Sequence, residues 1–299
     1  MGKIAVVTGA SGFIGTHLVK ALDEAFYDVW ALDVVRQITR LPRVQYYIGD
    51  VSDIDYLRGI FKGANFVFHL AALPRVQYSI EHPMETHVVN VTGTLNVLEA
   101  AKQAGVKRVV FSSSSSVYGD GASLSTREDA PLNPMSPYAE HKEMGERYCR
   151  LWSKLYGLET VCLRYFNVYG PDADPNGPYA QVIPKFIEQR LAGKPMTVTG
   201  DGEQTRDLIH VRDVVRANIL TAECPAVGNG EVINIGFGHN VSINRIAELI
   251  GGPVKHIPAR LEPHDTLADI SRAKELLGWK PTISIEEGIA ELKRVKNLV

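Results

Sequence analysis

Residues 4–15 read IAVVTGASGFIG, an apolar run that passes through Gly9, Gly12 and Gly15 into an amphipathic segment. The run predicts a buried strand over residues 4–8, and the pattern after it predicts a helix over 13–23. Glycine at such a turn lets backbone amides approach a phosphate, which the positive end of the helix then attracts. Any tight strand-to-helix turn can use glycine, so the triplet needs support from its surroundings.

Asp33 gives that support, because it closes the next predicted strand about 20 residues after the turn. A carboxylate at this distance suits the adenosine ribose of a dinucleotide and repels the 2′-phosphate of NADP. NAD is therefore favoured, although Arg36 leaves NADP open. Asp50 and Val51 follow the third predicted strand and suit contacts to adenine, with a helix N-cap as the alternative for Asp50.

The rest of the chain predicts an α/β fold. Apolar runs at residues 28–33, 44–48, 65–70, 108–113 and 160–165 alternate with amphipathic segments at 13–23, 53–61, 84–104 and 137–155. This pattern indicates a doubly wound, Rossmann-like parallel sheet with helices on both faces. We expect a dinucleotide-binding domain of residues 1–169 plus about 211–240. A smaller, mainly C-terminal substrate domain would hold residues 170–210 plus about 241–299.

Composition excludes several classes of protein. The chain has 299 residues, 45% hydrophobic and 22% charged, with a net charge of −2, so nothing draws it generally to nucleic acid or acidic membranes. No signal-like segment and no apolar run of about 18 residues is present, which predicts a cytoplasmic protein without a membrane span. Three scattered cysteines and nine dispersed histidines predict neither disulfides nor a metal site.

Tyr138 and Lys142 are four residues apart in a predicted helix, so their side chains share one face. An ammonium, together with the positive nicotinamide of NAD, would favour the phenolate and make the pair a general acid and base. Such pairs also occur by chance on helix surfaces. Upstream, serines at 112–116 end a predicted strand at the sheet edge where ligands bind, although a polar loop is the plain alternative.

These motifs, in this order, resemble the extended short-chain dehydrogenase/reductases, the NAD-dependent sugar-nucleotide epimerase/dehydratase family. Further shared motifs are HLAA at 69–72, NVTGT at 90–94, RYFNVYGP at 164–171, GDGEQTRD at 200–207, NIG at 234–236 and ADIS at 268–271. The resemblance covers nearly the whole chain. It implies bound NAD and 4-epimerisation of a UDP-hexose, such as UDP-glucose or UDP-galactose, through a transient 4-keto sugar.

The resemblance also implies roles by position. Tyr138 would be the acid and base, Lys142 its partner on the nicotinamide ribose, and Ser114 a hydrogen-bond partner of the reacting hydroxyl. The predicted cofactor-binding residues are Gly9, Gly12, Phe13, Ile14, Gly15, Asp33, Asp50, Val51, Leu70, Ala71, Ala72, Asn90, Ser112, Tyr138, Lys142 and Tyr165. The predicted substrate-binding residues are Ser114, Ser115, Ser116, Asn167, Gln181, Val182, Thr199, Arg206, Arg260 and Thr266.

Two positions discriminate among activities of the family. Dehydratases typically carry Asp-Glu just before the Val-Tyr-Gly, and the related decarboxylases carry Glu there, whereas this chain has Ser115 and Ser116. Without carboxylates the site resembles that of an epimerase. Thr266 stands where the family's residue borders the sugar 2-substituent, and its small size predicts that UDP-N-acetylhexosamines are also accepted.

Several alternatives stay open. They are epimerisation at another carbon, reduction of a keto-sugar, a dTDP-, CDP- or GDP-sugar as substrate, and a non-catalytic NAD-binding sensor. Arg260 is one residue nearer to Asp269 than the family pattern has it, so the contacts of Glu262 and Asp265 to the uridine ribose are open as well. The helices at 84–104 and 137–155 could pair with a second copy in a homodimer, or could serve the core.

Overall fold

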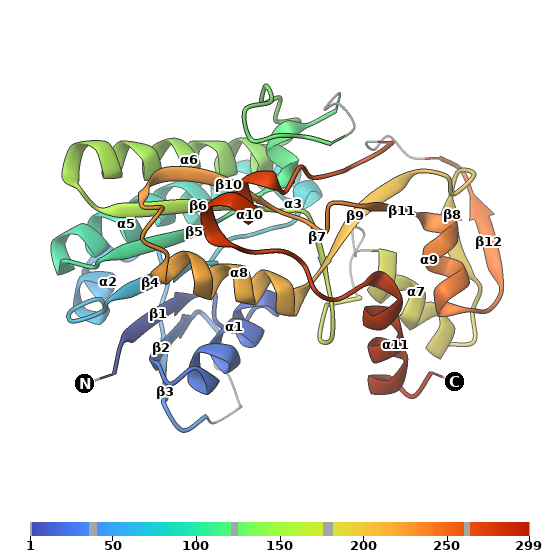
Figure 1. Ribbon diagram of the computed structural model, residues 1–299, viewed down its shortest axis with the longest axis horizontal. Helices are drawn as coiled ribbons and strands as arrows, with labels where there is room; N and C mark the ends of the chain where they lie inside the picture. The colour runs from blue at the N-terminus through green and yellow to red at the C-terminus, as the bar shows by residue number, and fades with distance from the viewer. Residues whose placement is uncertain (1, 36–40, 121–124, 176–181, 260–263, 299) are drawn as a thin grey trace.

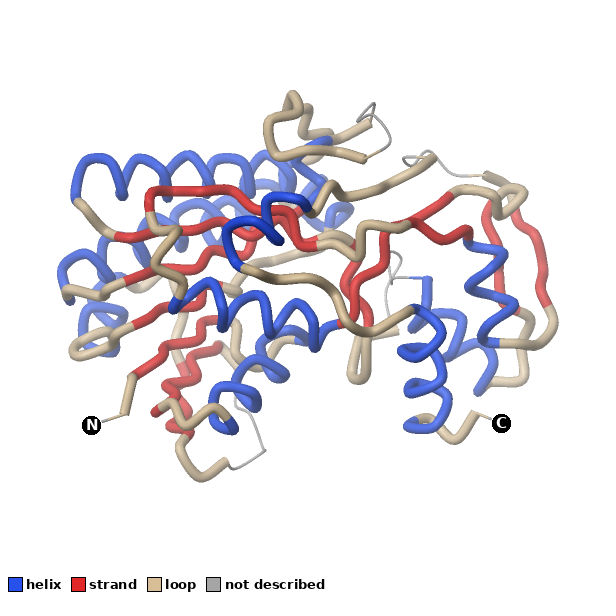
Figure 2. The backbone as a smooth tube through the Cα atoms, in the orientation of Figure 1, coloured by secondary structure: helices blue, strands red, loops and turns tan. Residues whose placement is uncertain are grey.

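The computed structural model describes residues 2–35, 41–120, 125–175, 182–259 and 264–298 (Figure 1). There the chain forms a large parallel sheet between two layers of helices, with a smaller unit beside it (Figure 2). The predicted doubly wound α/β architecture is confirmed. Within the described ranges, no helix combines the length and the apolar character that a bilayer span needs.

The large sheet has the strand order β10-β6-β5-β4-β1-β2-β3, and each neighbouring pair runs parallel. Its strands are β1 (Ile4–Thr8), β2 (Asp28–Asp33), β3 (Val44–Ile48), β4 (Phe66–His69), β5 (Arg108–Ser114), β6 (Glu159–Tyr165) and β10 (Asn229–Ile235). Alternate side chains of a strand point to opposite faces. On β1, Ala5 and Val7 therefore enter one apolar core and Val6 the other. Burial on both faces explains why the run is apolar throughout.

Different helices close the two cores. One face is covered by α1 (Phe13–Glu24), α8 (Val211–Glu223) and α10 (Ser271–Leu277), and the other by α2 (Ile54–Ile60), α5 (Gly93–Ala104) and α6 (Pro137–Tyr156) (Figure 1). The sequence predicts α10 within the substrate domain. In the structure Leu277 and Trp279 instead join the core of the large sheet, and the Trp279 indole donates to Asp213 O on α8 at 3.1 Å. This part of the C-terminal segment thus belongs to the packing of the large sheet.

The helix predicted over residues 84–104 is interrupted. It consists of α4 (Pro83–His87), a π-helical turn η1 (Val88–Thr92) and α5, and the short helix α3 (Val76–Glu81) precedes it. A π turn fits an extra residue into a helix and often lies at a functional site. Asn90 on this turn binds the backbone of Leu73 with both ends of its amide, at 2.8 Å from N and 3.1 Å from O.

The smaller unit lies beyond the carboxyl ends of the large sheet (Figures 1 and 2). It contains β7 (Asn167–Tyr169), β8 (Met196–Thr199), β9 (Thr205–His210), β11 (Asn240–Ser242), β12 (Val254–Ile257), α7 (Val182–Leu191), α9 (Ile243–Ile250) and α11 (Ile285–Val295). Strands β11, β9 and β7 form one sheet, and β12 pairs with β8. Phe186, Ile246 and Ile289 belong to its own apolar core.

The sheet reverses direction between β1 and β4. From β1 the chain moves outward to β2 and β3, and it then returns to β4 on the other side of β1. In doubly wound sheets the ligand lies outside the carboxyl ends of the two strands that flank this switch point. Gly9 follows β1 and Leu70 follows β4. The topology therefore predicts that a ligand binds at the loops that begin with these two residues.

Gly145 sets how closely α6 approaches the sheet. A Cβ at this position would lie 2.4 Å from Cζ of Phe111, a buried ring on β5. We expect Gly145→Ala to lower the free energy of unfolding by about 1–3 kcal/mol, because helix and ring must separate. Gly59→Ala on α2 is the matched control, since a Cβ there meets nothing and alanine favours a helix by about 0.5–1 kcal/mol. Urea unfolding measures both variants, and equal stabilities would contradict the packing.

Candidate active site

The turn after β1 is packed too tightly for side chains. Gly9 has a φ of 70°, and a Cβ on it would lie 2.6 Å from Ala71 N, in the loop after β4. A Cβ on Gly15 would lie 2.1 Å from Gly9 O. Glycine is required here because only its backbone allows this approach. The glycine turn after β1 therefore packs directly against the loop after β4, and these are the two loops that flank the switch point.

The first turn of α1 suits an anion. Gly12 is its N-cap, no side chain in the described part of the chain caps it, and Phe13 and Ile14 supply no acidic group. By contrast, Ser136 caps α6 and accepts from Ala139 N at 3.2 Å. An uncapped helix start leaves backbone N–H groups and the positive end of the dipole available to a phosphate. This turn fits the pyrophosphate of a dinucleotide.

Asp33 lies beside this turn at the end of β2. Its Oδ2 accepts from Ser11 N at 2.8 Å and its Oδ1 from Val35 N at 3.0 Å. Each carboxylate oxygen has more than one lone pair, so the group can still accept from ribose hydroxyls. The predicted acid is therefore in place next to the glycine turn.

Asp50 does not cap a helix. Its Oδ1 accepts from Ser52 N at 2.8 Å, whereas the N-cap of α2 is Asp53, whose Oδ1 accepts from Tyr56 N at 3.0 Å. The N-cap alternative for Asp50 is wrong. Its neighbour Val51 is buried against α5.

A buried chain of hydrogen bonds holds the loop after β4, residues 70–73. Thr8 Oγ1 lies 2.8 Å from His69 Nδ1, and His69 Nε2 lies 3.0 Å from Thr94 Oγ1. Thr94 Oγ1 donates to Asn90 O at 2.6 Å, so it accepts from a neutral ring protonated at Nε2. Burial lowers the pKa of His69 to about 3, which agrees with this state. His69 is a structural residue. Thr8 accepts from the backbone N of Leu70 at 3.1 Å and of Ala71 at 3.3 Å, so this hydrogen-bonded chain positions the loop in which Ala72 also lies.

Helix α6 carries the predicted acid–base pair to the end of β5. Tyr138 is in its first turn, where the backbone N donates to Ser79 Oγ of α3 at 3.0 Å. Lys142 lies one turn further, and its Nζ donates to Ser112 O at 2.7 Å. The same Nζ lies 5.8 Å from the centroid of the Tyr138 ring. The structure thus brings Tyr138 and Lys142 together beside the serine run.

The serines at the end of β5 have different partners. Ser114 Oγ accepts from Ser116 N at 3.2 Å, and its hydroxyl is close enough to the Tyr138 phenol to lower the pKa of that group. Ser116 Oγ is buried without a partner among the described residues, and Ser115 is half-buried beside it. An unpaired buried hydroxyl is costly unless a ligand completes it.

Ser112 lies deeper in the strand, with Tyr165 of β6. Tyr165 Oη donates to Asn218 Oδ1 at 2.9 Å, so at 3.1 Å it accepts from Ser112 Oγ. Burial raises the pKa of Tyr165 to about 12, so this phenol stays protonated. Both side chains are satisfied within the protein and support the floor of the site.

Burial changes the pKa of both members of the pair. Burial lowers the pKa of Lys142 to about 8. Burial also raises the pKa of Tyr138, and its hydrogen bond to Ser114 offsets that only in part. In the protein without NAD, desolvation by burial dominates the pKa of Tyr138, and the Lys142 ammonium is directed at Ser112 O. That Lys142 and the positive nicotinamide together favour the phenolate stays a prediction.

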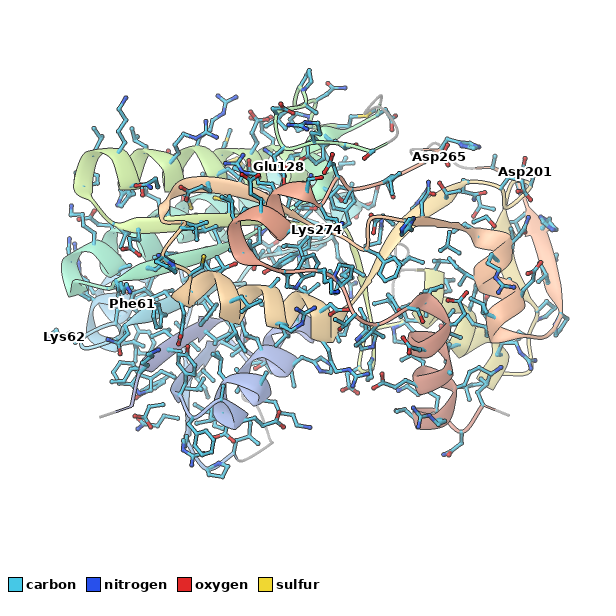
Figure 3. All side chains as sticks on the ribbon, in the orientation of Figure 1. Phe61, Lys62, Glu128, Asp201, Asp265 and Lys274 are labelled. Carbon is cyan, nitrogen blue, oxygen red and sulfur yellow. The ribbon has the colours of Figure 1, made fainter. Side chains whose placement is uncertain are left out.

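A buried ion pair lies behind this site. Glu146, one turn after Lys142 on α6, accepts from Arg164 of β6 at 2.8 Å from Nε and 2.7 Å from Nη2. Ser113 Oγ donates to the same carboxylate at 2.5 Å. Arg164 Nη1 also donates to the backbone O of Glu128, which lies above α10 in Figure 3. Because both charged side chains are about 3% exposed, the arrangement fixes α6 against β5 and β6.

Predicted substrate residues meet where β7 and β9 adjoin. Asn167 Nδ2 donates to Asp207 O at 3.1 Å and to Thr266 Oγ1 at 3.3 Å. Arg206 is half-buried on β9, and its Nη1 donates to His264 O at 3.1 Å. Asn167, Arg206 and Thr266 are thereby brought into one region.

The other predicted substrate residues make contacts of their own or lie outside the described ranges. Thr199 O accepts from Gln204 Nε2 at 3.0 Å, and Val182 begins α7. Asp265, at the rim of the smaller unit in Figure 3, accepts from Thr205 N at 3.1 Å. Gln181, Arg260 and Glu262 lie outside the residues that the structure describes.

Comparison with known proteins identifies the family of this chain. A profile of the NAD-dependent epimerase/dehydratase family matches residues 5–236. The chain belongs to this family. NAD is the cofactor of its members, and the glycine turn, the uncapped start of α1 and Asp33 fit that dinucleotide.

Individual epimerases are similar along almost their whole length. The UDP-glucose 4-epimerase of Mycolicibacterium smegmatis is 38% identical, over 96% of each chain. The UDP-N-acetylglucosamine 4-epimerase of Methanobrevibacter ruminantium, solved with UDP-N-acetylmuramic acid, is 36% identical, with a TM-score of 0.91 over 98% of this chain and 99% of that one. The UDP-glucuronic acid 4-epimerase of Bacillus cereus, solved with UDP-glucuronic acid and NAD, is 33% identical, with a TM-score of 0.88 over 99% of this chain and 100% of that one.

Some supporting residues of this epimerase/dehydratase fold escape sequence reasoning. Asp207 is buried, and its carboxylate accepts from Phe237 N at 2.6 Å, Gly238 N at 3.0 Å and Ala268 N at 2.9 Å. Burial raises its pKa to about 6. Its place beside Arg206 in a shared motif is the signal that could have found it, whereas Ser79 carries no comparable signal.

Lys142 should destabilise the folded state, because its ammonium is buried in the site. Its pKa falls from 10.5 to about 8 on burial, so between these values the unfolded chain binds more protons and stability rises with pH. We expect Lys142→Met to be more stable than wild type at pH 7 without NAD, with the difference shrinking toward pH 10.5. Urea unfolding between pH 7 and 10 measures this, and parallel pH profiles for the two proteins would contradict it.

Proposed function

We propose that this protein catalyses NAD-dependent 4-epimerisation of a UDP-hexose. One observation carries the proposal: Ser114, Tyr138 and Lys142 converge at the end of β5, on the same sheet edge as a glycine turn that fits NAD. A module that only binds NAD needs no proton-transferring group at this place. Membership of the epimerase/dehydratase family supports the same reading.

In the proposed reaction, bound NAD supplies the acceptor and donor for the C4 hydride of the sugar. The Tyr138 phenolate takes the proton of the 4-hydroxyl as the 4-keto sugar forms, and returns it when the hydride is delivered to the other face. Ser114 Oγ, which is close to the Tyr138 phenol, would hold the reacting oxygen. Burial alone opposes the Tyr138 phenolate, which would be favoured by a positive nicotinamide bound beside it. The cycle leaves no net oxidation, so NAD need not exchange.

The division into two units suits the two ligands. Residues 1–169 plus about 211–240, apart from β7, would bind the dinucleotide. Strand β7 with residues 170–210 plus about 241–299, apart from α10, would bind the nucleotide sugar. Asn167 and Arg206 would hold the diphosphate, with Thr266 bordering the sugar. Ser116 Oγ, which is buried and unpaired among the described residues, would complete its hydrogen bonds on the sugar. With serines at 115 and 116, the chain lacks at those positions the carboxylates that the family's dehydratases and decarboxylases use.

We also propose a homodimer. Ile80 on α3, Met84 on α4 and Leu155 on α6 are all more than half exposed, although each is large and apolar. Helices α3 and α4 lie against the first turns of α6, whereas Leu155 is near its last turn, so exposed apolar side chains occur at both ends of this helix. Pairing along this helix with a second copy would bury them.

The first experiment uses the purified protein without added cofactor. It is incubated separately with UDP-galactose, UDP-N-acetylgalactosamine and UDP-glucuronic acid, and anomeric-proton NMR identifies the products. Conversion at C4 with no added NAD supports the proposal and reports the preferred sugar. If none is converted even with NAD supplied, 4-epimerisation of these sugars is ruled out.

Tyr138→Phe should lower kcat by about 100-fold to 10,000-fold, because it removes the proton-transferring hydroxyl. The amount of bound NAD should not change. Tyr148→Phe removes a hydroxyl from the same helix and is the matched control. A kcat of Tyr138→Phe within about threefold of the wild-type value would contradict the role of Tyr138 as acid and base.

Thr266→Tyr should narrow the range of substrates. We expect kcat/KM for UDP-N-acetylgalactosamine to fall about tenfold or more relative to that for UDP-galactose, because the larger side chain crowds the 2-substituent. Thr266→Ser is the control that keeps the hydroxyl bonded to Asn167. Unchanged turnover of the acetylated sugar by Thr266→Tyr would refute the assignment.

A further inference from the structure

A short segment leaves the smaller unit and returns to the large one. Residues 170–175, here called the strap, follow β7 directly. Tyr169 before it is buried in the core of the smaller unit, and its ring meets that of His210 edge-on at 5.3 Å. A Cβ on Gly170 would lie 2.5 Å from Val211 Cγ1, so the origin of the strap is tightly held.

The first contact of the strap with the large unit is His17 on α1. Its Nε2 lies 2.9 Å from Pro171 O, and since a carbonyl only accepts, the ring donates. The same nitrogen lies 3.9 Å from Asp172 Oδ2. The ring also packs edge-on against Phe13, the first residue of α1, at 5.7 Å. This contact is therefore one turn from the proposed pyrophosphate site.

The second contact is an ion pair. Arg75 Nη2 lies 3.0 Å from Asp174 Oδ2, and the two side chains are 54% and 55% exposed. Arg75 is the N-cap residue of α3, directly after the loop that follows β4. An exposed pair of this kind contributes little alone.

The two contacts lie on opposite sides of the switch point. Helix α1 follows β1, Arg75 follows β4, and these neighbouring strands flank the place where the dinucleotide is expected. Neighbouring strands are about 5 Å apart. The strap begins with a turn, in which Ala173 N donates to Gly170 O at 3.5 Å, and its two contact residues, Pro171 and Asp174, are three residues apart. Three residues can reach at most about 10 Å, so the strap can join contacts beside neighbouring strands.

We propose that the strap spans the dinucleotide site and sets the rate at which NAD leaves. This rests on the proposed function, in which NAD is regenerated in each cycle and gains nothing by exchange. The two contacts are individually weak, so the strap can open for the cofactor to enter. Together they hold His17 and Arg75 to the same six-residue segment, and loss of both frees it.

The test measures release of bound NAD, not turnover. Wild type, His17→Ala, Arg75→Ala and the double variant are loaded with NAD and diluted, and the retained NAD is assayed after gel filtration over time. We expect each single variant to release NAD about 2–5 times faster and the double variant about 10 times faster. Arg245→Ala is the matched control, since its exposed ion pair with Glu248 at 3.2 Å lies on α9, outside the strap.

A charge swap separates the ion pair from general damage. Arg75→Asp should release NAD faster, and adding Asp174→Arg should restore slow release. Thermal unfolding without NAD checks that the variants are folded. One outcome is that wild type retains bound NAD, while the double variant and Arg75→Asp release NAD at the wild-type rate. In that case the strap proposal fails and the proposed function stands. If wild type does not bind NAD at all, both fail.

Discussion

The buried pair between Arg164 and Glu146 is the interaction on which the site depends. It joins the middle of α6 to β6, and Ser113 attaches β5 to the same carboxylate. Tyr138 and Lys142 lie two turns and one turn before Glu146 on α6. Their position relative to the serine run therefore follows from where Glu146 is held. Such a pair adds little net stability, but removing one partner leaves an uncompensated buried charge, which makes the arrangement difficult to change.

The contacts beneath the sheet edge are buried and rigid, whereas those that hold the strap across it are weaker. Under the sheet edge, Thr8, His69, Thr94 and Asn90 form a buried chain in which each polar group has a defined partner. Across that edge, the strap is held by a partly exposed histidine and an exposed ion pair. A buried network keeps geometry constant, whereas exposed contacts can form and break rapidly at small cost in free energy. The first suits hydride and proton transfer, and the second suits entry of a cofactor.

Most of the sheet could be predicted because its strands are apolar at successive positions, and β1, β2 and β3 have the predicted bounds. The interruption at η1 could not, since five residues contain too little side-chain periodicity to distinguish a π turn from an α turn. The placement of α10 depends on Trp279 meeting α8, a contact between residues far apart in the chain.

The candidate site, like the fold, could be predicted from the sequence only in part. The spacing of Tyr138 and Lys142 and the serine run was sufficient to find them. The sequence reveals the charge that neighbours Tyr138, but not the desolvation that raises its pKa in the protein without NAD, nor that Lys142 Nζ is directed at Ser112 O. Ser79 and Glu146 were missed because their partners come from other elements.

The π turn also bears on how this sequence can change over evolutionary time. Each residue of an α-helix rotates the chain by about 100°. Deleting one codon within residues 88–92 would restore a regular helix and rotate Asn90 relative to α5, so its amide would leave Leu73. The helix would be more regular and the loop beside the glycine turn would lose its support. Length changes should therefore be selected against in this helix more strongly than point substitutions on its exposed face.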